Sequence, residues 1–157
     1  MSGCVVIGIG NPLMRDDGIG VHVIRHLQGK LPGGVELVEG SIYSVDLLTV
    51  LENRRKVVFI DGIDAGEPAG EIFRFSLADV PQRRTGVPLS LHDFGIYELV
   101  AAAKLLDQCP GTVILIAVQV GDVELGERLS DQLAESIPRI CQLVLDEVID
   151  SGKPCRT

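Results

Sequence analysis

The feature that most constrains the fold is an alternation between short apolar runs and segments with helical periodicity. The run Cys4 to Ile9 is apolar on both faces and rich in β-branched residues, as expected for a strand covered by helices on two sides. From about Asp17 to Gln28, apolar residues recur on one helical stripe. A strand followed by a loop and a helix in this way predicts a parallel sheet with right-handed crossovers.

The same alternation continues to the end of the chain. We predict further strands at Val35 to Val38, Lys56 to Ile60, Glu71 to Leu77 and Thr112 to Val118, and helices at Val45 to Leu51, about Asp93 to Leu106, and from about Leu129 to Val148. Turn residues precede Glu71, which favours an antiparallel strand at an edge. The expected fold is a three-layer α/β/α sandwich with a mainly parallel sheet of about five strands.

Length and charge limit the organisation and the partners. A chain of 157 residues with 46% hydrophobic content predicts one domain over residues 1–157, with residues 151–157 as a frayed tail. The 22 acidic and 14 basic residues give a formal charge of −8, which repels nucleic acids and anionic membrane surfaces. A basic or nickel-bearing protein surface remains open as a partner.

The chain carries no targeting signal that we recognise. Met1 to Ile9 has no basic stretch before an apolar one, and no apolar run approaches the ~20 residues of a membrane span. Four cysteines are scattered without a C-x-x-C pair. We therefore expect a cytoplasmic protein without a disulfide framework or a zinc knuckle.

The loop from Gly8 to Gly20 superficially resembles a dinucleotide-binding fingerprint. Its glycine spacing is wrong, and two carboxylates, Asp16 and Asp17, stand at the helix start where a phosphate would bind. Paired negative charges there oppose phosphate binding. Glu39 lies where that motif places its ribose-binding acid, but we expect NAD, NADP and flavins not to bind.

Two acids are expected at the carboxyl edge of the parallel sheet, where such folds place their sites. Asp17 lies between the first predicted strand and the first predicted helix, and Asp61 directly follows the strand Lys56 to Ile60. Asp16 could instead cap the helix, and Asp61 could be a turn residue. Carboxylates that converge repel each other unless a cation or a proton lies between them.

His92 is the natural third ligand of such a site. It follows the irregular segment Pro81 to Ser90 and precedes a predicted helix. We predict that His22 and His26 are instead surface or half-buried residues of the first helix. Two carboxylates and one imidazole suit nickel, zinc or manganese and leave coordination positions open. No G-x-S-x-G elbow is present, and Cys4 lies inside a buried strand, so a serine or cysteine nucleophile is not indicated.

Taken together, these residues resemble the nickel-iron hydrogenase maturation endopeptidases along nearly the whole chain. The matching positions are Gly8, Gly10, Asn11, Asp16, Asp17, Gly18 and Gly20, then Asp61, Ala69-Gly70-Glu71-Ile72, His92 and Gln119. The resemblance implies that Asp17, Asp61 and His92 form the metal and catalytic site. It also implies that the enzyme cuts a C-terminal extension from the hydrogenase large-subunit precursor after nickel insertion, with the substrate's nickel as the recognised ion. Zinc or cadmium could occupy the same ligands, and a monomer is expected.

The chain departs from the family pattern at two places. It has Glu39-Gly40-Ser41-Ile42 where many members carry Asp-Gly-Gly-Thr, and Val120 where proline is frequent after the glutamine. Both positions are candidates for substrate contact and bear on which hydrogenase is the partner. Two rival hypotheses remain, a nickel-binding chaperone without hydrolytic activity and a small nucleotide-binding module.

Overall fold

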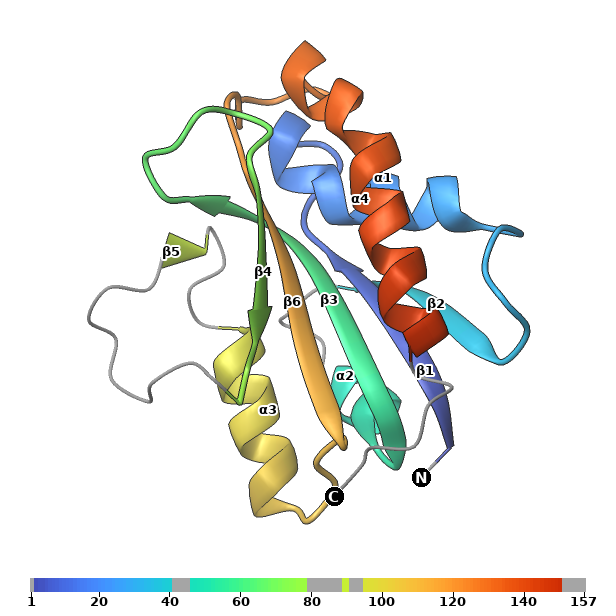
Figure 1. Cartoon of the computed structure of the whole chain (residues 1–157). Coiled ribbons are helices and arrows are strands. Elements are labelled where there is room, and N and C mark those ends of the chain that lie inside the picture. Colours follow the sequence, from blue (N-terminus) through green and yellow to red (C-terminus); the bar gives the residue numbers. More distant parts are fainter. Residues whose placement is uncertain (1, 41–45, 79–88, 91–94, 151–157) are drawn as a thin grey trace.

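The computed structural model describes residues 2–40, 46–78, 89–90 and 95–150 (Figure 1). Its elements in chain order are β1 (Ser2–Ile9), the 3-10 helix η1 (Arg15–Gly18), α1 (Ile19–Leu27), β2 (Val35–Gly40), α2 (Asp46–Leu51), β3 (Arg54–Asp64), β4 (Ile72–Ser76), β5 (Leu89–Ser90), α3 (Ile96–Leu105), β6 (Thr112–Gln119) and α4 (Asp131–Asp150).

The sheet is mainly parallel, as predicted. Its strand order is β2-β1-β3-β6-β4, and the short β5 also pairs with β3. The pairs β1–β2, β1–β3 and β3–β6 are parallel, whereas β4 lies antiparallel to β6 at the edge. The antiparallel edge strand that the turn residues indicated is therefore confirmed.

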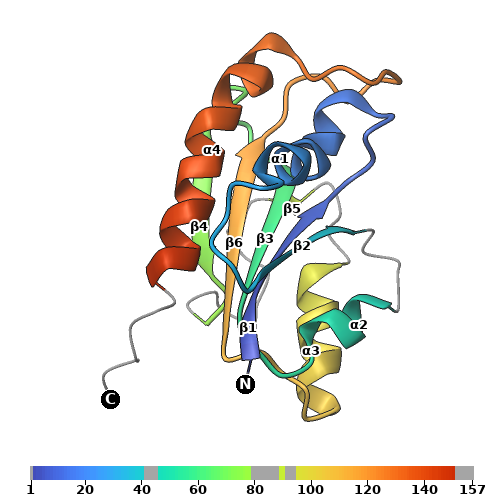
Figure 2. The ribbon, with the colours of Figure 1, turned by 90° about the vertical axis from the view of Figure 1, so that its right-hand side faces the viewer.

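Helices cover both faces of the sheet, which explains why its central strands are apolar at consecutive positions. Val6, Val58 and Ile116 belong to a core cluster that also contains α1 and α4 residues. Their neighbours Val5 and Phe59 point to the opposite face, in a cluster with α2 and α3 residues. Figures 1 and 2 show the resulting order of α1 and α4, the sheet, and α2 and α3. The three-layer α/β/α sandwich is confirmed.

One boundary differs in a way that matters for the site. We predicted that the strand ends at Ile60, but β3 continues to Asp64 because β6 goes on pairing with it as far as Ile63↔Gln119. Asp61 is therefore a strand residue, and its interpretation as a turn residue is wrong. The turn comes later, where the Gly66 N–H donates to the Asp64 carboxylate over 3.2 Å.

Several sequence expectations fall on segments that the structure leaves undescribed. The tail 151–157 lies outside the described residues, as do most of Pro81 to Ser90 and the predicted start of the third helix at Asp93. Among the described residues, α3 begins at Ile96. None of the described helices is both long enough and apolar enough to cross a membrane.

Candidate functional site

The glycines of the first loop let the helical segment lie directly on the sheet. A Cβ atom at Gly20 would lie 2.4 Å from the Ile60 carbonyl oxygen and 2.5 Å from that of Ile9. Gly10 has a φ of +136°, and a Cβ there would meet the Asp17 carbonyl oxygen at 1.9 Å. The pattern that resembled a phosphate-binding loop thus serves close packing, which brings η1 and the start of α1 against the ends of β1 and β3.

Asp17 lies in η1 and is 8% exposed. Its Oδ2 accepts the Asn11 N–H over 2.9 Å, so the carboxylate faces the segment that leaves β1. No side-chain cap bond is made at the start of either η1 or α1, where the N-cap residues are Met14 and Gly18.

Asp61 is fully buried and lies at the same end of the sheet. The β1–β3 ladder ends at the pair Gly8↔Ile60, so Asp61 is one residue beyond it, level with the end of β1. By strand alternation its side chain shares the face of Phe59 and Ile63, which contribute to the α2 and α3 side of the core. Because η1 contacts β3, both buried carboxylates belong to the region where β1 ends.

His92, the third predicted ligand, lies outside the described residues. The nearest described residue before it is Ser90, which pairs with Ile63 of β3. Within the described part of the chain, no group of three or more His, Cys, Asp and Glu residues could hold a metal ion. The complete Asp17, Asp61 and His92 site therefore stays a prediction.

The other two histidines are on α1, as predicted. His22 is half-buried, and burial, followed by the positive charges of Arg25 and His26, lowers its pKa. His26 is exposed, and its Nδ1 lies 2.9 Å from the backbone carbonyl oxygen of His22, one turn earlier. A hydrogen bond with the backbone of Glu127, in the segment after β6, partly opposes this lowering of the His22 pKa.

Asp16 has a role that the sequence did not reveal. Its carboxylate is fully buried and accepts four hydrogen bonds, from the N–H groups of Gly121 (2.9 Å), Asp122 (2.8 Å) and Ser130 (2.7 Å) and from the Ser130 hydroxyl (2.8 Å). Helix capping is thus the wrong interpretation for this residue. Asp16 ties the segment after β1 to the segment after β6, over more than a hundred residues of sequence, and no local pattern signals such a contact.

Gln119 fixes the turn that follows β3. Its Oε1 accepts the N–H groups of Ala65 (2.7 Å) and Glu67 (3.3 Å), while its Nε2 donates to the Val120 carbonyl oxygen (2.9 Å). Val120 is only 8% exposed, and its N–H donates to the Ile63 carbonyl oxygen over 3.0 Å. A proline could not make that bond, and the burial of Val120 disfavours this position as a candidate for direct substrate contact.

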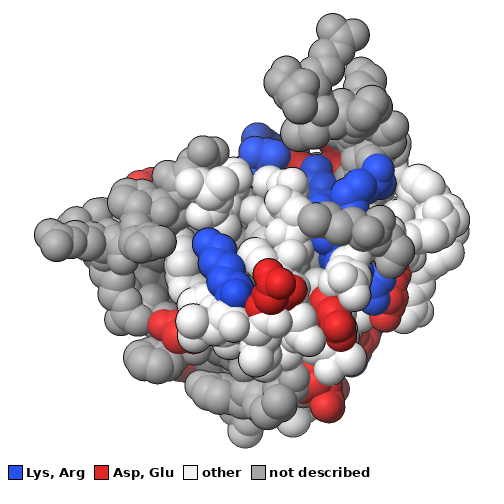
Figure 3. Space-filling view, turned by 90° about the horizontal axis from the view of Figure 1, so that it is seen from below, with Lys and Arg blue, Asp and Glu red and all other residues white. Residues whose placement is uncertain are grey.

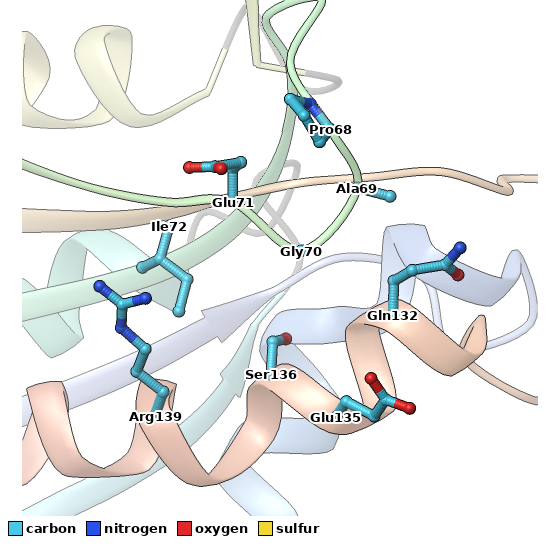
Figure 4. Close-up of a pocket in the computed structure, with 9 residues that line it drawn as sticks. All are labelled: Pro68, Ala69, Gly70, Glu71, Ile72, Gln132, Glu135, Ser136 and Arg139. Carbon is cyan, nitrogen blue, oxygen red and sulfur yellow. The ribbon is translucent and has the colours of Figure 1, made fainter.

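An open groove of about 370 Å³ lies between the start of β4 and α4 (Figure 4). Its lining includes Gly70, Glu71, Ile72, Glu135 and Arg139. Charges of both signs border it, and neither Asp17 nor Asp61 lines it. This groove is a surface feature separate from the buried carboxylates.

Comparisons with known proteins agree on one family. The sequence model of the hydrogenase maturation proteases matches residues 21–147. The hydrogenase expression/formation protein HupD of Bradyrhizobium diazoefficiens is 32% identical over 149 residues, which cover 90% of this chain and 78% of that protein. The hydrogenase 2 maturation protease of Escherichia coli is 26% identical, with 94% of this chain and 92% of that protein covered. The solved structure of the hydrogenase maturating endopeptidase HybD from E. coli has a TM-score of 0.84 at 25% identity, covering 96% of this chain and 94% of that one.

Proposed function

The chain belongs to the hydrogenase maturation protease family, and from that premise we propose that it removes the C-terminal extension of a nickel-iron hydrogenase large-subunit precursor after nickel insertion. In this proposal Asp17, Asp61 and His92 recognise the nickel that the substrate carries. The protein works in the cytoplasm, where it meets the precursor.

The observation that carries the proposal is the burial of two carboxylates at one end of the sheet. Asp17 is 8% exposed and Asp61 is fully buried. Withdrawing carboxylates from water costs free energy that a nearby cation offsets. A divalent ion presented by the substrate would supply that positive charge at the moment of binding, so these residues suit recognition of a metal-loaded precursor.

The pairing of β5 supports His92 as the third ligand. β5 and β3 are antiparallel with the register Ile63↔Ser90 and Asp64↔Leu89. Ser90 therefore lies beside Ile63, two residues after Asp61, and His92 follows Ser90 by two residues in the sequence. The proposal therefore assigns the imidazole to the same ion as the Asp61 carboxylate.

The three side chains would act first by holding and orienting the substrate. Carboxylate oxygen and imidazole nitrogen are ligands that nickel accepts, and three of them leave positions for the groups that hold nickel in the precursor. Fixing the nickel fixes the peptide segment next to it, which lowers the entropic cost of attack on the scissile bond. The nucleotide-binding hypothesis is disfavoured, because the Asp17 carboxylate faces the glycine loop, where it accepts the Asn11 N–H and would repel a phosphate.

The decisive experiment is incubation with the large-subunit precursor, with and without nickel, followed by mass spectrometry. We expect loss of the C-terminal extension from the nickel-loaded precursor only. Asp17→Asn, Asp61→Asn and His92→Ala should each abolish cleavage, whereas His26→Ala, which removes an exposed imidazole on α1, should cleave normally. Thermal melts of each variant confirm that it is folded.

Three results would contradict parts of this proposal. Equal cleavage of both precursors by the wild-type protein would rule out nickel recognition. Full activity in Asp17→Asn or His92→Ala would rule out the assigned site. Tight binding of the loaded precursor without cleavage would favour the non-hydrolytic nickel chaperone.

A further inference from the structure

Two loops at the carboxyl end of the sheet expose large apolar side chains. Leu13, in the segment after β1, is 53% exposed, while Val123 and Leu125, in the segment after β6, are 37% and 82% exposed. Single exposed leucines are common on protein surfaces. What distinguishes these is that they come from segments far apart in sequence and lie at one place.

Backbone hydrogen bonds hold the two segments together. Met14 and Gly126 form a parallel bridge, in which the Gly126 N–H donates to the Leu13 carbonyl oxygen and the Arg15 N–H donates to the Gly126 carbonyl oxygen, each over 2.8 Å. Leu13 and Leu125 each precede a bridged residue, so they are neighbours across this pair. Figure 2 shows the two segments side by side, in blue and orange, at the upper end of the molecule. We call the surface formed by Leu13, Val123 and Leu125 the Leu13–Leu125 patch.

The patch is mounted on a rigid support. The buried Asp16 carboxylate binds the backbone on both sides of the 123–126 segment, and Arg15 forms an ion pair with Asp122 at 3.2 Å. An apolar surface that is already ordered loses little conformational freedom when a partner covers it. Leu13 is also only four residues from Asp17 along the same segment.

Charge indicates the chemistry of the partner. The two paired segments, residues 11–18 and 120–130, carry more acids than bases: Asp16, Asp17, Asp122, Glu124 and Glu127 against Arg15 and Arg128. Glu124 and Glu127 are exposed on either side of Leu125, and the whole chain carries a formal charge of −8. A partner surface that complements this region has an apolar depression with a basic rim.

We propose that the Leu13–Leu125 patch is the docking surface for the folded body of the large-subunit precursor, which contacts it through an apolar depression with a basic rim. This inference rests on the proposed function and adds a second contact to it. The patch holds the body of the substrate beside Asp17, while the metal-binding residues engage the nickel.

The other end of the molecule provides a matched control. Leu105, the last residue of α3, is 89% exposed and lies near the start of the parallel strands. Figure 3 views this end, where the described side chains include both positive and negative charges. Leu105→Asp therefore makes the same chemical change on a leucine that is more exposed than either patch leucine, far from the patch.

The test compares Leu13→Asp, Leu125→Asp and Leu105→Asp in cleavage kinetics and in calorimetric titration with the nickel-loaded precursor. At both patch positions we expect KM and Kd to rise at least ~10-fold with kcat unchanged, as for a central interface residue. Leu105→Asp should stay within about twofold of wild type. Glu124→Lys should raise the Kd for the precursor and make that Kd less dependent on salt concentration. Glu135→Lys, on α4 at the groove, should change neither quantity.

Each result that differs from this expectation contradicts a specific part of the proposal. If the wild-type protein cleaves the precursor but the patch variants bind it like Leu105→Asp, docking at the patch is wrong and the proposed function stands. If the wild-type protein neither binds nor cleaves the precursor, the proposed function fails and the docking partner with it. If sedimentation shows a wild-type dimer that Leu125→Asp dissociates, the patch joins two copies of this chain instead. Equal weakening by Glu135→Lys would move the contact to the groove.

Discussion

At the scale of single residues, the adjacent aspartates Asp16 and Asp17 have different hydrogen-bond partners. Asp17 faces the end of β1, whereas Asp16 is enclosed by the segment after β6. The sequence correctly picked out both as unusual acids at a strand-to-helix junction. It could not assign Asp16, because all four of its hydrogen-bond partners lie more than a hundred residues away.

Replacing Asp16 should cost far more stability than replacing an exposed acid nearby. In Asp16→Asn, an NH2 group replaces one of the two carboxylate oxygens that accept these hydrogen bonds. An NH2 group cannot accept, so at least one buried N–H or O–H donor loses its acceptor. We expect a loss of roughly 3 kcal/mol or more in the free energy of unfolding. Glu124→Gln removes an exposed negative charge from the segment that encloses Asp16 and should change the free energy of unfolding by less than ~0.5 kcal/mol. Urea unfolding measures both, and a loss below 1 kcal/mol in Asp16→Asn would contradict the assigned role.

At the scale of elements, sequence patterns found each strand and α-helix in the described part of the chain except the two-residue β5. Periodicity reports which residues are buried, and burial on both faces identified β1, β3 and β6. It does not report where pairing stops, so the extension of β3 past Ile60 was missed. The end of β3 depends on β6 and β5, which come later in the chain.

The close packing of α1 on the sheet predicts an unusual response to alanine. Gly→Ala in a helix normally stabilises by up to ~1 kcal/mol. At Gly20 the added Cβ would meet backbone oxygens of Ile9 and Ile60 at 2.4–2.5 Å, so we expect destabilisation of about 2 kcal/mol or more and reduced cleavage as Asp17 shifts. Gly33→Ala, where a Cβ meets nothing within 4 Å, should be neutral or slightly stabilising. Thermal melts of Gly20→Ala and Gly33→Ala measure both effects. A Gly20→Ala variant more stable than wild type would contradict the close packing of α1 on the sheet.

A partly buried ion cluster joins the C-terminal part of α4 to the sheet. Glu147 accepts hydrogen bonds from Arg74 of β4 and from Lys56 of β3, the latter over 2.6 Å. Burial raises the pKa of Glu147, but the hydrogen bonds from Arg74 and Lys56 outweigh it, and the net result is a lowered pKa.

This lowered pKa makes the contribution of Glu147 depend on pH. A carboxyl whose pKa falls on folding stabilises fully above its unfolded value of about 4.3, and that stabilisation is lost as the pH drops through the folded value. Glu147→Gln should cost roughly 3 kcal/mol at pH 7, at the low end for a broken buried pair because Arg74 is half-exposed. Its difference from wild type should shrink below about pH 4, as followed by urea unfolding. The exposed neighbour variant Asp146→Asn should show neither effect, and a pH-independent difference would disprove the linkage.

At the scale of the whole molecule, the features assigned to function gather at one end of the sheet. The glycine-packed η1, the buried carboxylates and the Leu13–Leu125 patch all adjoin the carboxyl ends of parallel strands. The sequence predicted that edge, because strand direction in a parallel sheet follows from the alternation of strands and helices. It did not predict the patch, since the pairing of the two loops is tertiary.

We expect the isolated protein to be a monomer of 16.9 kDa in sedimentation experiments at micromolar concentration. A charge of −8 disfavours self-association near neutral pH, and its solubility should be lowest near pH 4.8, where the net charge vanishes. A concentration-dependent dimer at pH 7 and low salt would contradict this expectation.

The ring of donors around Asp16 also has a consequence for motion. Segments without regular secondary structure usually exchange their amide hydrogens with solvent quickly, because they open locally at little cost. The amides of Gly121, Asp122 and Ser130 cannot open without breaking their hydrogen bonds to the buried Asp16 carboxylate. In deuterium-exchange mass spectrometry or NMR, these three loop amides should therefore be protected almost as strongly as those of β6, and in Asp16→Asn they should exchange like an ordinary surface loop.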